Sequence, residues 1–218
     1  LSSEIWAQLN VFYNRMLALR PLDIADNNIV SVCNFVRESC QNHTGIAEGT
    51  FPRDQGWSFY QLGKHTERAD QITRLVDIKY HILLPRLEDV GSPLDTSQWQ
   101  ALLRAAAAFH AYRRSYPRGL EPTMIAGFLL LNQSFPRSLS YCVSVIDVTL
   151  NDLRMRYGLK GGGTALEIID ELRAGISSQG IDMIVAHGLH EFIDWTQDRL
   201  IDMTDSLYSD FFNMANVA

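Results

Sequence analysis

The chain has 218 residues, with 19 basic and 25 acidic side chains and a net charge of −6 at pH 7. A chain of this length buries a core without disulfides or metal ions, and the acidic balance argues against a nucleic-acid partner, because phosphate binding needs a concentrated basic face. No apolar run approaches the roughly 20 residues of a membrane helix, and the three cysteines, an odd number, favour a reducing cytoplasm.

Two amphipathic helices are predicted at the start of the chain. In residues 3–20, apolar side chains recur at spacings of three and four, and Pro21 ends the run. A second helix, over about residues 26–42, carries apolar side chains and two cysteines toward the core. The segment that follows, residues 42–56, is rich in Gly and polar residues, which predicts a flexible loop.

A long helix is predicted from Trp57 to Pro85. Its apolar and small residues alternate by three and four without a break, at Phe59, Leu62, Thr66, Ala69, Thr73, Val76, Tyr80 and Leu83. This pattern is a heptad seam. Because several of its members are small, a neighbouring helix could approach closely.

Five further helices are predicted in the rest of the chain. They cover residues 95–116, 121–133, 135–158, 164–177 and 182–212. The first and fourth of them begin with the spacing of a capping box, Asp95 with Gln98 and Thr164 with Glu167. No alternating β-branched run bounded by turns occurs. The sequence therefore predicts an all-α protein, an antiparallel bundle of about seven or eight helices with no sheet, in one domain over residues 1–218.

Two charged residues, Glu67 and Arg68, stand near the middle of the long helix. On a helical wheel they point to different sides, so they cannot act as a side-by-side pair. Glu67 has two interpretations. The first is a surface carboxylate paired with Lys64. The second is a carboxylate held against another helix by a cation such as Arg74 or Arg137, since an unpaired buried charge is too costly.

Arg68 and His65 also leave alternatives open. The Arg68 stem either packs over the edge of the core with its head in water, or forms a buried pair. His65 lies within the apolar arc of the helix, where a hydrogen-bonded core histidine is favoured over a ligand or a base.

Arg137 follows Pro136 in the first turn of its predicted helix. The positive end of the helix dipole disfavours a cation there. We therefore expect a carboxylate partner within about 6 Å, with Glu67 as first choice and Asp70 or Asp77 as alternatives. The other interpretation is that Arg137 reaches back to solvent.

Other patterns that could carry chemistry are weak. His187, His190 and Glu191 match neither the His-Glu-x-x-His of zinc proteases nor the repeated Glu-x-x-His of diiron bundles, so no metal site is expected. The GGGT at residues 161–164 lacks the Lys-Ser/Thr of a phosphate loop. No cofactor, nucleophile or catalytic residue is predicted, and the cysteines are interpreted as small core residues.

Three ordered segments resemble one known family. The pattern W-x-F-x-x-L-G-x-x-x-E-R-A-D-x-x-T-R-x-x-D over residues 57–77 resembles the signature of the bacterial alpha-E family, predicted helical proteins named for a Glu-Arg motif. SEIWAQLN at residues 3–10 and FPRSLSYC at residues 135–142 are similar to further segments of that family. Its members carry an earlier copy of a Gly-x-x-x-Glu-Arg-Ala segment upstream, so the resemblance implies that this chain is the later portion of such a protein.

The resemblance also implies a context for the function. The family is associated with ATP-grasp ligases and transglutaminase-like peptidases, which suggests a non-catalytic helical partner or substrate-carrying module in peptide or amide-bond synthesis or processing. The alternative is an enzyme or ligand-binding bundle with a polar cavity for an anionic ligand. That cavity would be lined by Glu67, Arg68, Arg74, Arg137 and His65. The absence of a nucleophile or metal set favours the first interpretation.

Overall fold

The computed structural model describes residues 2–25, 28–81, 92–117 and 119–213. Within these ranges the chain forms ten α-helices, one short 3₁₀-helix and no strand, which confirms the predicted all-α class. None of the described helices is long and apolar enough to cross a membrane. The chain divides into two compact units, Leu1–Trp57 and Ser58–Ala218. That they form the single domain predicted for residues 1–218 stays a prediction.

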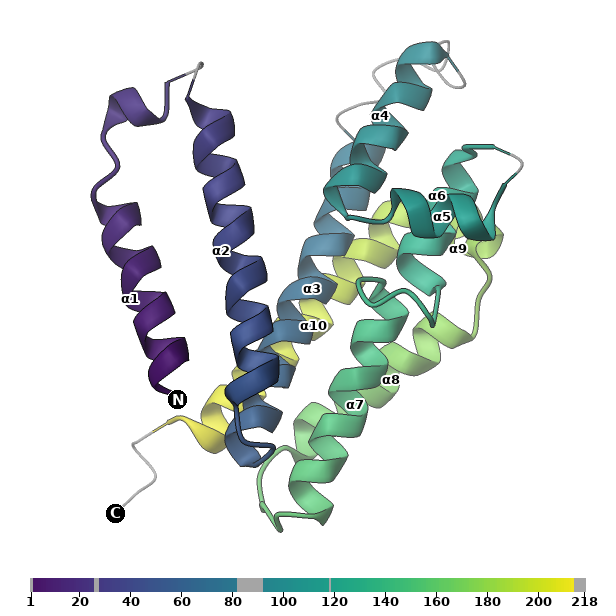
Figure 1. Cartoon of the computed structure of the whole chain (residues 1–218). Helices are drawn as coiled ribbons and strands as arrows, with labels where there is room; N and C mark the ends of the chain where they lie inside the picture. The colour runs from purple at the N-terminus through teal and green to yellow at the C-terminus, as the bar shows by residue number, and fades with distance from the viewer. Residues whose placement is uncertain (1, 26–27, 82–91, 118, 214–218) are drawn as a thin grey trace. The chain divides into compact units, whose positions relative to one another are not determined.

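The first unit is a hairpin of two antiparallel helices, α1 (Ser3–Leu17) and α2 (Ile29–Thr50) (Figure 1). A 3₁₀-helix, η1 (Pro21–Asp23), follows α1. The Gln8 side chain ties the two helices together, because its Nε2 donates to the Ser39 carbonyl oxygen (3.0 Å).

The predicted flexible loop over residues 42–56 is wrong, because α2 continues through its first nine residues to Thr50. Ala47 is fully buried in the hairpin, and the Ser2 and Thr50 hydroxyls lie 2.8 Å apart. Packing against α1 outweighs the low helix propensity of the two glycines in this stretch.

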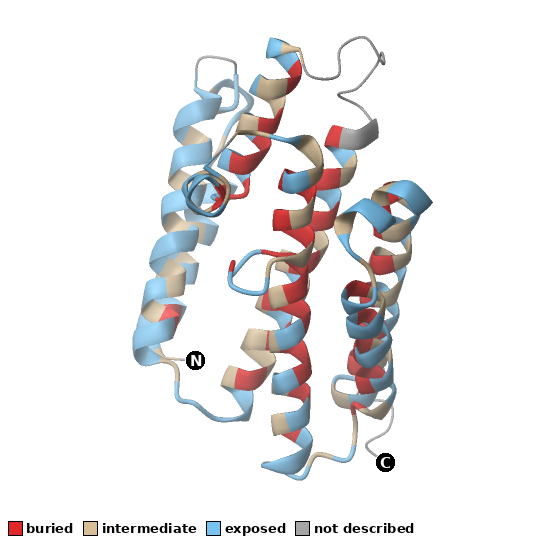
Figure 2. Ribbon diagram, turned by 90° about the vertical axis from the view of Figure 1, so that its right-hand side faces the viewer, coloured by how far each residue is buried: buried red, intermediate tan, exposed pale blue. Residues whose placement is uncertain are grey.

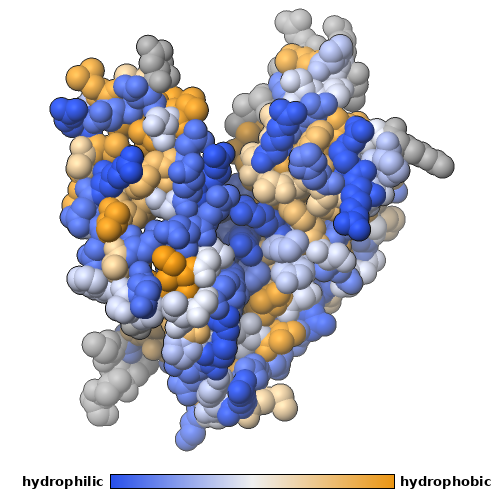
Figure 3. All heavy atoms as spheres, viewed as in Figure 1, coloured by the Kyte–Doolittle hydropathy of each residue, from blue (hydrophilic) through white to orange (hydrophobic). Residues whose placement is uncertain are grey.

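Most of the hairpin's surface is exposed, as the pale blue of α1 and α2 in Figure 2 shows. Ile5 and Ala47 are its buried apolar residues, whereas Trp6 is 64% exposed. Figure 3 shows apolar side chains gathered on the outside of this unit. Cys33 and Cys40, expected in the core, are also exposed. Two helices alone bury only one narrow stripe each, so the remaining apolar positions stay at the surface.

The second unit contains most of α3 (Gln55–His81) and seven further helices. They are α4 (Pro93–Ala105), α5 (Phe109–Ser115), α6 (Pro122–Leu131), α7 (Leu139–Met155), α8 (Gly163–Ser177), α9 (Ile181–His187) and α10 (Leu189–Phe211). α8 packs between α7 and α10, and α6 packs against α7 and α9. Their buried side chains form one continuous core (red in Figure 2).

The heptad seam predicted for α3 faces that core. Leu62, Ala69, Thr73 and Val76 are all buried. The Thr73 hydroxyl accepts a hydrogen bond from Nε2 of Gln197 on α10 (3.2 Å). The small residue therefore lets α10 approach α3, as the seam predicted. The last seam position, Leu83, lies outside the described residues.

The helix count differs from prediction because two predicted helices each break in two. The predicted helix 95–116 breaks at Ala107, which has a left-handed φ of 54°. The predicted helix 182–212 breaks at Gly188, with φ 120°. At the first break the Ala108 N–H reaches back to the Leu103 carbonyl (2.7 Å). That hydrogen bond ends α4, and the residue that donates it, Ala108, is fully buried in the core.

Neither predicted capping box caps its helix. Ser92 caps α4, its hydroxyl accepting from the Asp95 N–H, while the Asp95 side chain bonds to Lys79 instead. Gly162, in the left-handed conformation, precedes α8 with no side-chain cap. Its N–H donates to the carboxylate of Asp210 (2.7 Å). The Asp95 side chain and the Gly162 N–H thus each bond to a residue distant in sequence.

Ala107→Gly is expected to raise the free energy of unfolding by about 1 kcal/mol, because the left-handed conformation strains every residue with a Cβ. Ala101→Gly, at an exposed position inside α4, is the matched control. It should lower the free energy of unfolding by about 1 kcal/mol. Urea denaturation measures both, and equal destabilisation by the two substitutions would contradict the assignment of the break.

Candidate functional site

The side chains of Glu67 and Arg68 point to different sides of α3, as the helical wheel predicted. Glu67 is exposed and lines a groove shared with α10. Arg68 is half-buried, and its charge acts on Arg137 and Cys142 at the start of α7. The next residue, Ala69, is fully buried between them in the core. One helix thus presents the acid and the base of the motif to different neighbours.

The turn that precedes α7 is fixed by hydrogen bonds within it. The Asn132 side chain accepts from the N–H groups of Ser134 (2.9 Å) and Phe135 (2.8 Å). The Ser138 hydroxyl donates to the Asn132 carbonyl and accepts from the Tyr141 N–H, which caps α7. Arg137 therefore lies in a rigid turn just before the cap, not in the first helical turn as predicted.

In the described part of the chain, no carboxylate forms an ion pair with the Arg137 guanidinium, and the charges that act on it are those of Arg68 and Cys142. A carboxylate within about 6 Å of Arg137 stays a prediction. Burial lowers the pKa of Arg137, and the nearby charge of Arg68 lowers it further. The expected partners lie elsewhere. Asp70 bonds to Arg74 (2.8 Å), and Asp77 bonds to His190 on α10 (2.9 Å).

His65 lies one turn before Arg68 and is only 5% exposed. Its ring is 6.0 Å from that of Tyr141 on α7. The buried Nδ1 has no hydrogen-bond partner among the described residues. Burial lowers the pKa of His65 to about 4, and the charges of Arg68 and Lys64 act in the same direction. The imidazole is therefore neutral at physiological pH, with an unused polar atom in the protein interior.

Cys142 completes this group, with its Sγ 3.9 Å from the carbonyl oxygen of Pro136. Burial raises the pKa of its thiol to about 12, against the opposing effect of Arg68 and Arg137. A protonated thiol is neither a nucleophile nor a counterion. Arg68 and Arg137 thus stand beside two neutral groups, an arrangement that can bind an anion.

On the other side of α3, a groove of about 240 Å³ lies between α3 and α10. It is lined by Thr66, Glu67, Asp70 and Arg74 of α3 and by Leu200, Ile201, Thr204 and Asp205 of α10. The hydrogen bond to Asp70 raises the pKa of Arg74, with a smaller effect of Glu67. The cation of this groove is therefore already neutralised by its own helix.

The five residues predicted to share one polar cavity are divided between these two places. Arg68 acts electrostatically on His65 of its own helix and on Arg137 in the turn before α7. Glu67 and Arg74 lie in the α10 groove. Sequence reasoning did not single out Tyr141 or Cys142, although both belong to the FPRSLSYC segment that follows the same turn.

No group of three or more potential metal ligands occurs among the residues that the structure describes. The two histidines considered for this role bond elsewhere. His187 Nδ1 lies 2.8 Å from the Met183 carbonyl oxygen, and His190 bonds to Asp77.

Comparison with known proteins gives one match. A family model for a predicted alpha-helical domain with a conserved ER motif matches residues 1–212. Neither the curated proteins nor the solved structures contain a match to this chain. Glu67-Arg68 is the one Glu-Arg dipeptide in the sequence of the chain.

Proposed function

The chain belongs to the Alpha-E family, and from this premise we propose that it is a helical binding module that holds an anionic group between Arg68 and Arg137. The ligand class is a carboxylate or a phosphate. One observation carries the proposal: the half-buried Arg68 and the exposed Arg137 act on each other electrostatically, and neither guanidinium forms an ion pair with a carboxylate among the described residues.

Electrostatics favours an anion at this place. Two like charges held close together repel each other, and an anion between them would replace that repulsion with two charge-assisted hydrogen bonds. Guanidinium groups suit carboxylate and phosphate because they present paired N–H donors. The amino end of α7, a helix of 17 residues, adds the positive end of its dipole beside Arg137.

The neighbouring groups support binding rather than a chemical step. The Cys142 thiol stays protonated because burial raises its pKa to about 12. His65 has a pKa of about 4, far below the range of an efficient general base at neutral pH. Its unused Nδ1 can take part in a hydrogen bond to the ligand as donor or acceptor, according to the tautomer.

The family resemblance supplies the context. We propose that the module serves an ATP-grasp ligase or a transglutaminase-like peptidase as partner or substrate carrier. Ligases and peptidases of amide bonds act on molecules with free or newly released carboxylates, the group that an arginine pair recognises. The anion site would then hold the carboxylate of the carried peptide.

Calorimetric titration tests the anion site. Inorganic phosphate and N-acetylglycine, added at constant ionic strength, should bind the wild-type chain. Arg68→Gln and Arg137→Gln should each weaken binding by about tenfold or more, the effect of losing one charge-assisted pair. Arg156→Gln is the matched control, because this arginine lies in the exposed ion pair with Asp152 (3.9 Å). If all three variants bind these anions as tightly as the wild-type chain does, the proposal is overturned.

The partner role needs its own test. A purified ATP-grasp ligase or transglutaminase-like peptidase should be retained on the immobilised chain, and less so on the Arg137→Gln variant. If neither protein is retained while phosphate still binds, the partner role fails and the anion site stands. If retention does not depend on Arg137, the contact with the partner uses another surface.

A further inference from the structure

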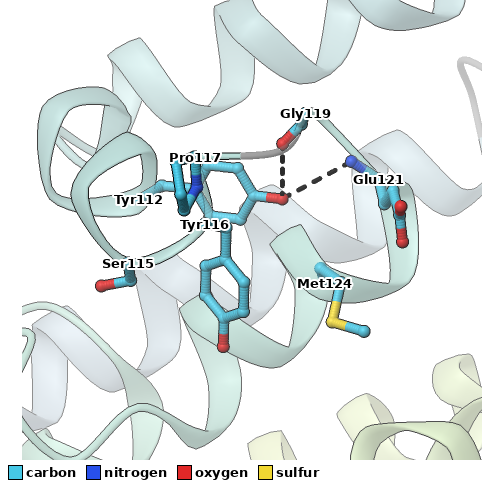
Figure 4. A pocket seen from close by; sticks show the side chains of 7 residues that line it. All are labelled: Tyr112, Ser115, Tyr116, Pro117, Gly119, Glu121 and Met124. Carbon is cyan, nitrogen blue, oxygen red and sulfur yellow. Dashed lines mark hydrogen bonds between the residues drawn. The ribbon is translucent and has the colours of Figure 1, made fainter.

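A second pocket lies where α5 ends and α6 begins, apart from the arginine pair (Figure 4). Its volume is about 370 Å³, within the range of small-molecule sites. It is lined by Tyr112, Ser115, Tyr116, Pro117, Gly119, Glu121 and Met124. The lining is mostly aromatic and apolar, with one carboxylate.

Hydrogen bonds hold the walls of this pocket in place. Tyr112 is fully buried, and its hydroxyl donates to the Gly119 carbonyl oxygen (3.3 Å) while accepting from the Glu121 N–H (3.5 Å). The Tyr112 and Tyr116 rings stack with centroids 5.0 Å apart. Each of these two rings also makes an edge-to-face contact with Phe128 of α6. The pocket is therefore formed before any ligand arrives.

The pocket lining contains one carboxylate, that of Glu121. Glu121 is exposed, and no described residue forms an ion pair with its carboxylate. The pocket lies at the carboxyl end of α5, whose last turn also carries the exposed Arg113 and Arg114. Figure 4 shows the Glu121 carboxylate and the Met124 thioether on one side of the Tyr116 ring.

We propose that this pocket binds an organic ammonium ion. The Tyr116 ring offers a cation–π face, Glu121 supplies the counter-charge, and Met124 with Pro117 packs against the carbon groups of the ligand. The Glu121 charge disfavours a phosphate or carboxylate ligand, so this site and the arginine pair would select ligands of opposite sign. The proposal does not depend on the proposed function.

Choline and N-acetyl-lysine amide are suitable probes, since one carries a quaternary and the other a primary ammonium group. The neutral isostere 3,3-dimethylbutan-1-ol separates charge from shape. We expect choline to bind the full chain at least tenfold more tightly than the alcohol, by titration followed through NMR shifts of the Met124 methyl group. Glu121→Gln, a substitution at an exposed position, should weaken binding of choline about tenfold.

Glu167→Gln on the exposed face of α8 is the matched carboxylate control and should leave binding unchanged. Tyr116→Leu tests the ring, with circular dichroism to show that the variant is folded. Stronger binding of N-acetyl-lysine amide than of choline would indicate that the ligand is a lysine side chain of a peptide. Stronger binding of choline would indicate a quaternary ammonium ion. Equal binding of choline and the alcohol, no binding of either amine, or unchanged binding in Glu121→Gln would overturn the proposal.

Discussion

Lys79→Met is expected to lower the free energy of unfolding by about 3–5 kcal/mol, the effect of removing one member of a buried ion pair. Lys79 is fully buried and Asp95 is 3% exposed. The Lys79 ammonium donates to the Asp95 carboxylate (2.7 Å) and to the Gln98 side-chain oxygen (2.8 Å). Without that cation the carboxylate stays in the interior between α3 and α4, which is costly. Urea denaturation at pH 7 measures the loss.

A double variant separates the pair from the packing around it. Lys79→Met with Asp95→Leu should recover most of the stability, because apolar residues of similar volume replace a buried pair at little cost. Arg74→Met is the control, since the Arg74 and Asp70 pair lies near the surface and should be worth less than about 1 kcal/mol. If Lys79→Met costs no more than Arg74→Met, the pair is not buried as described.

The fold class can be predicted from the hydrophobic periodicity of the sequence. The ends of the helices cannot, because they depend on contacts between residues that are far apart in the chain. The α3 seam is predictable because Leu62, Ala69 and Val76 repeat along one face. The break at Ala107 is not, because alanine is the best helix former and only the burial of Ala108 explains why the chain turns there.

The candidate site, too, could be predicted from the sequence only in part. Because local geometry determines the direction of a side chain on a helix, the divergence of Glu67 and Arg68 could be worked out from a wheel. The surroundings of Arg137 could not be worked out in this way, since they depend on which face of α3 meets α7. The Lys79–Asp95 pair has one sequence signal, a lysine three residues after Val76 on the buried face, but nothing in the sequence locates its carboxylate.

Acid should destabilise the chain through His65, by about 3 kcal/mol between pH 6.5 and pH 4. The folded state holds this imidazole neutral, with its pKa lowered from 6.5 to about 4, first by burial and then by Arg68. The unfolded chain takes up the proton at the higher pH. The contribution of His65 is therefore complete above pH 6.5 and is lost as the pH falls toward 4. Over this range, urea denaturation should show a smaller loss for His65→Leu than for the wild type.

Two further variants decide whether that loss arises at the arginine pair. His190→Gln should keep it, because the hydrogen bond to Asp77 raises the pKa of His190 and its contribution disappears with rising pH, not falling pH. Arg68→Gln should reduce the loss, since it removes a neighbouring positive charge that opposes protonation of His65. If Arg68→Gln leaves the acid sensitivity unchanged, then Arg68 does not face His65, and the arrangement on which the anion site depends fails with it.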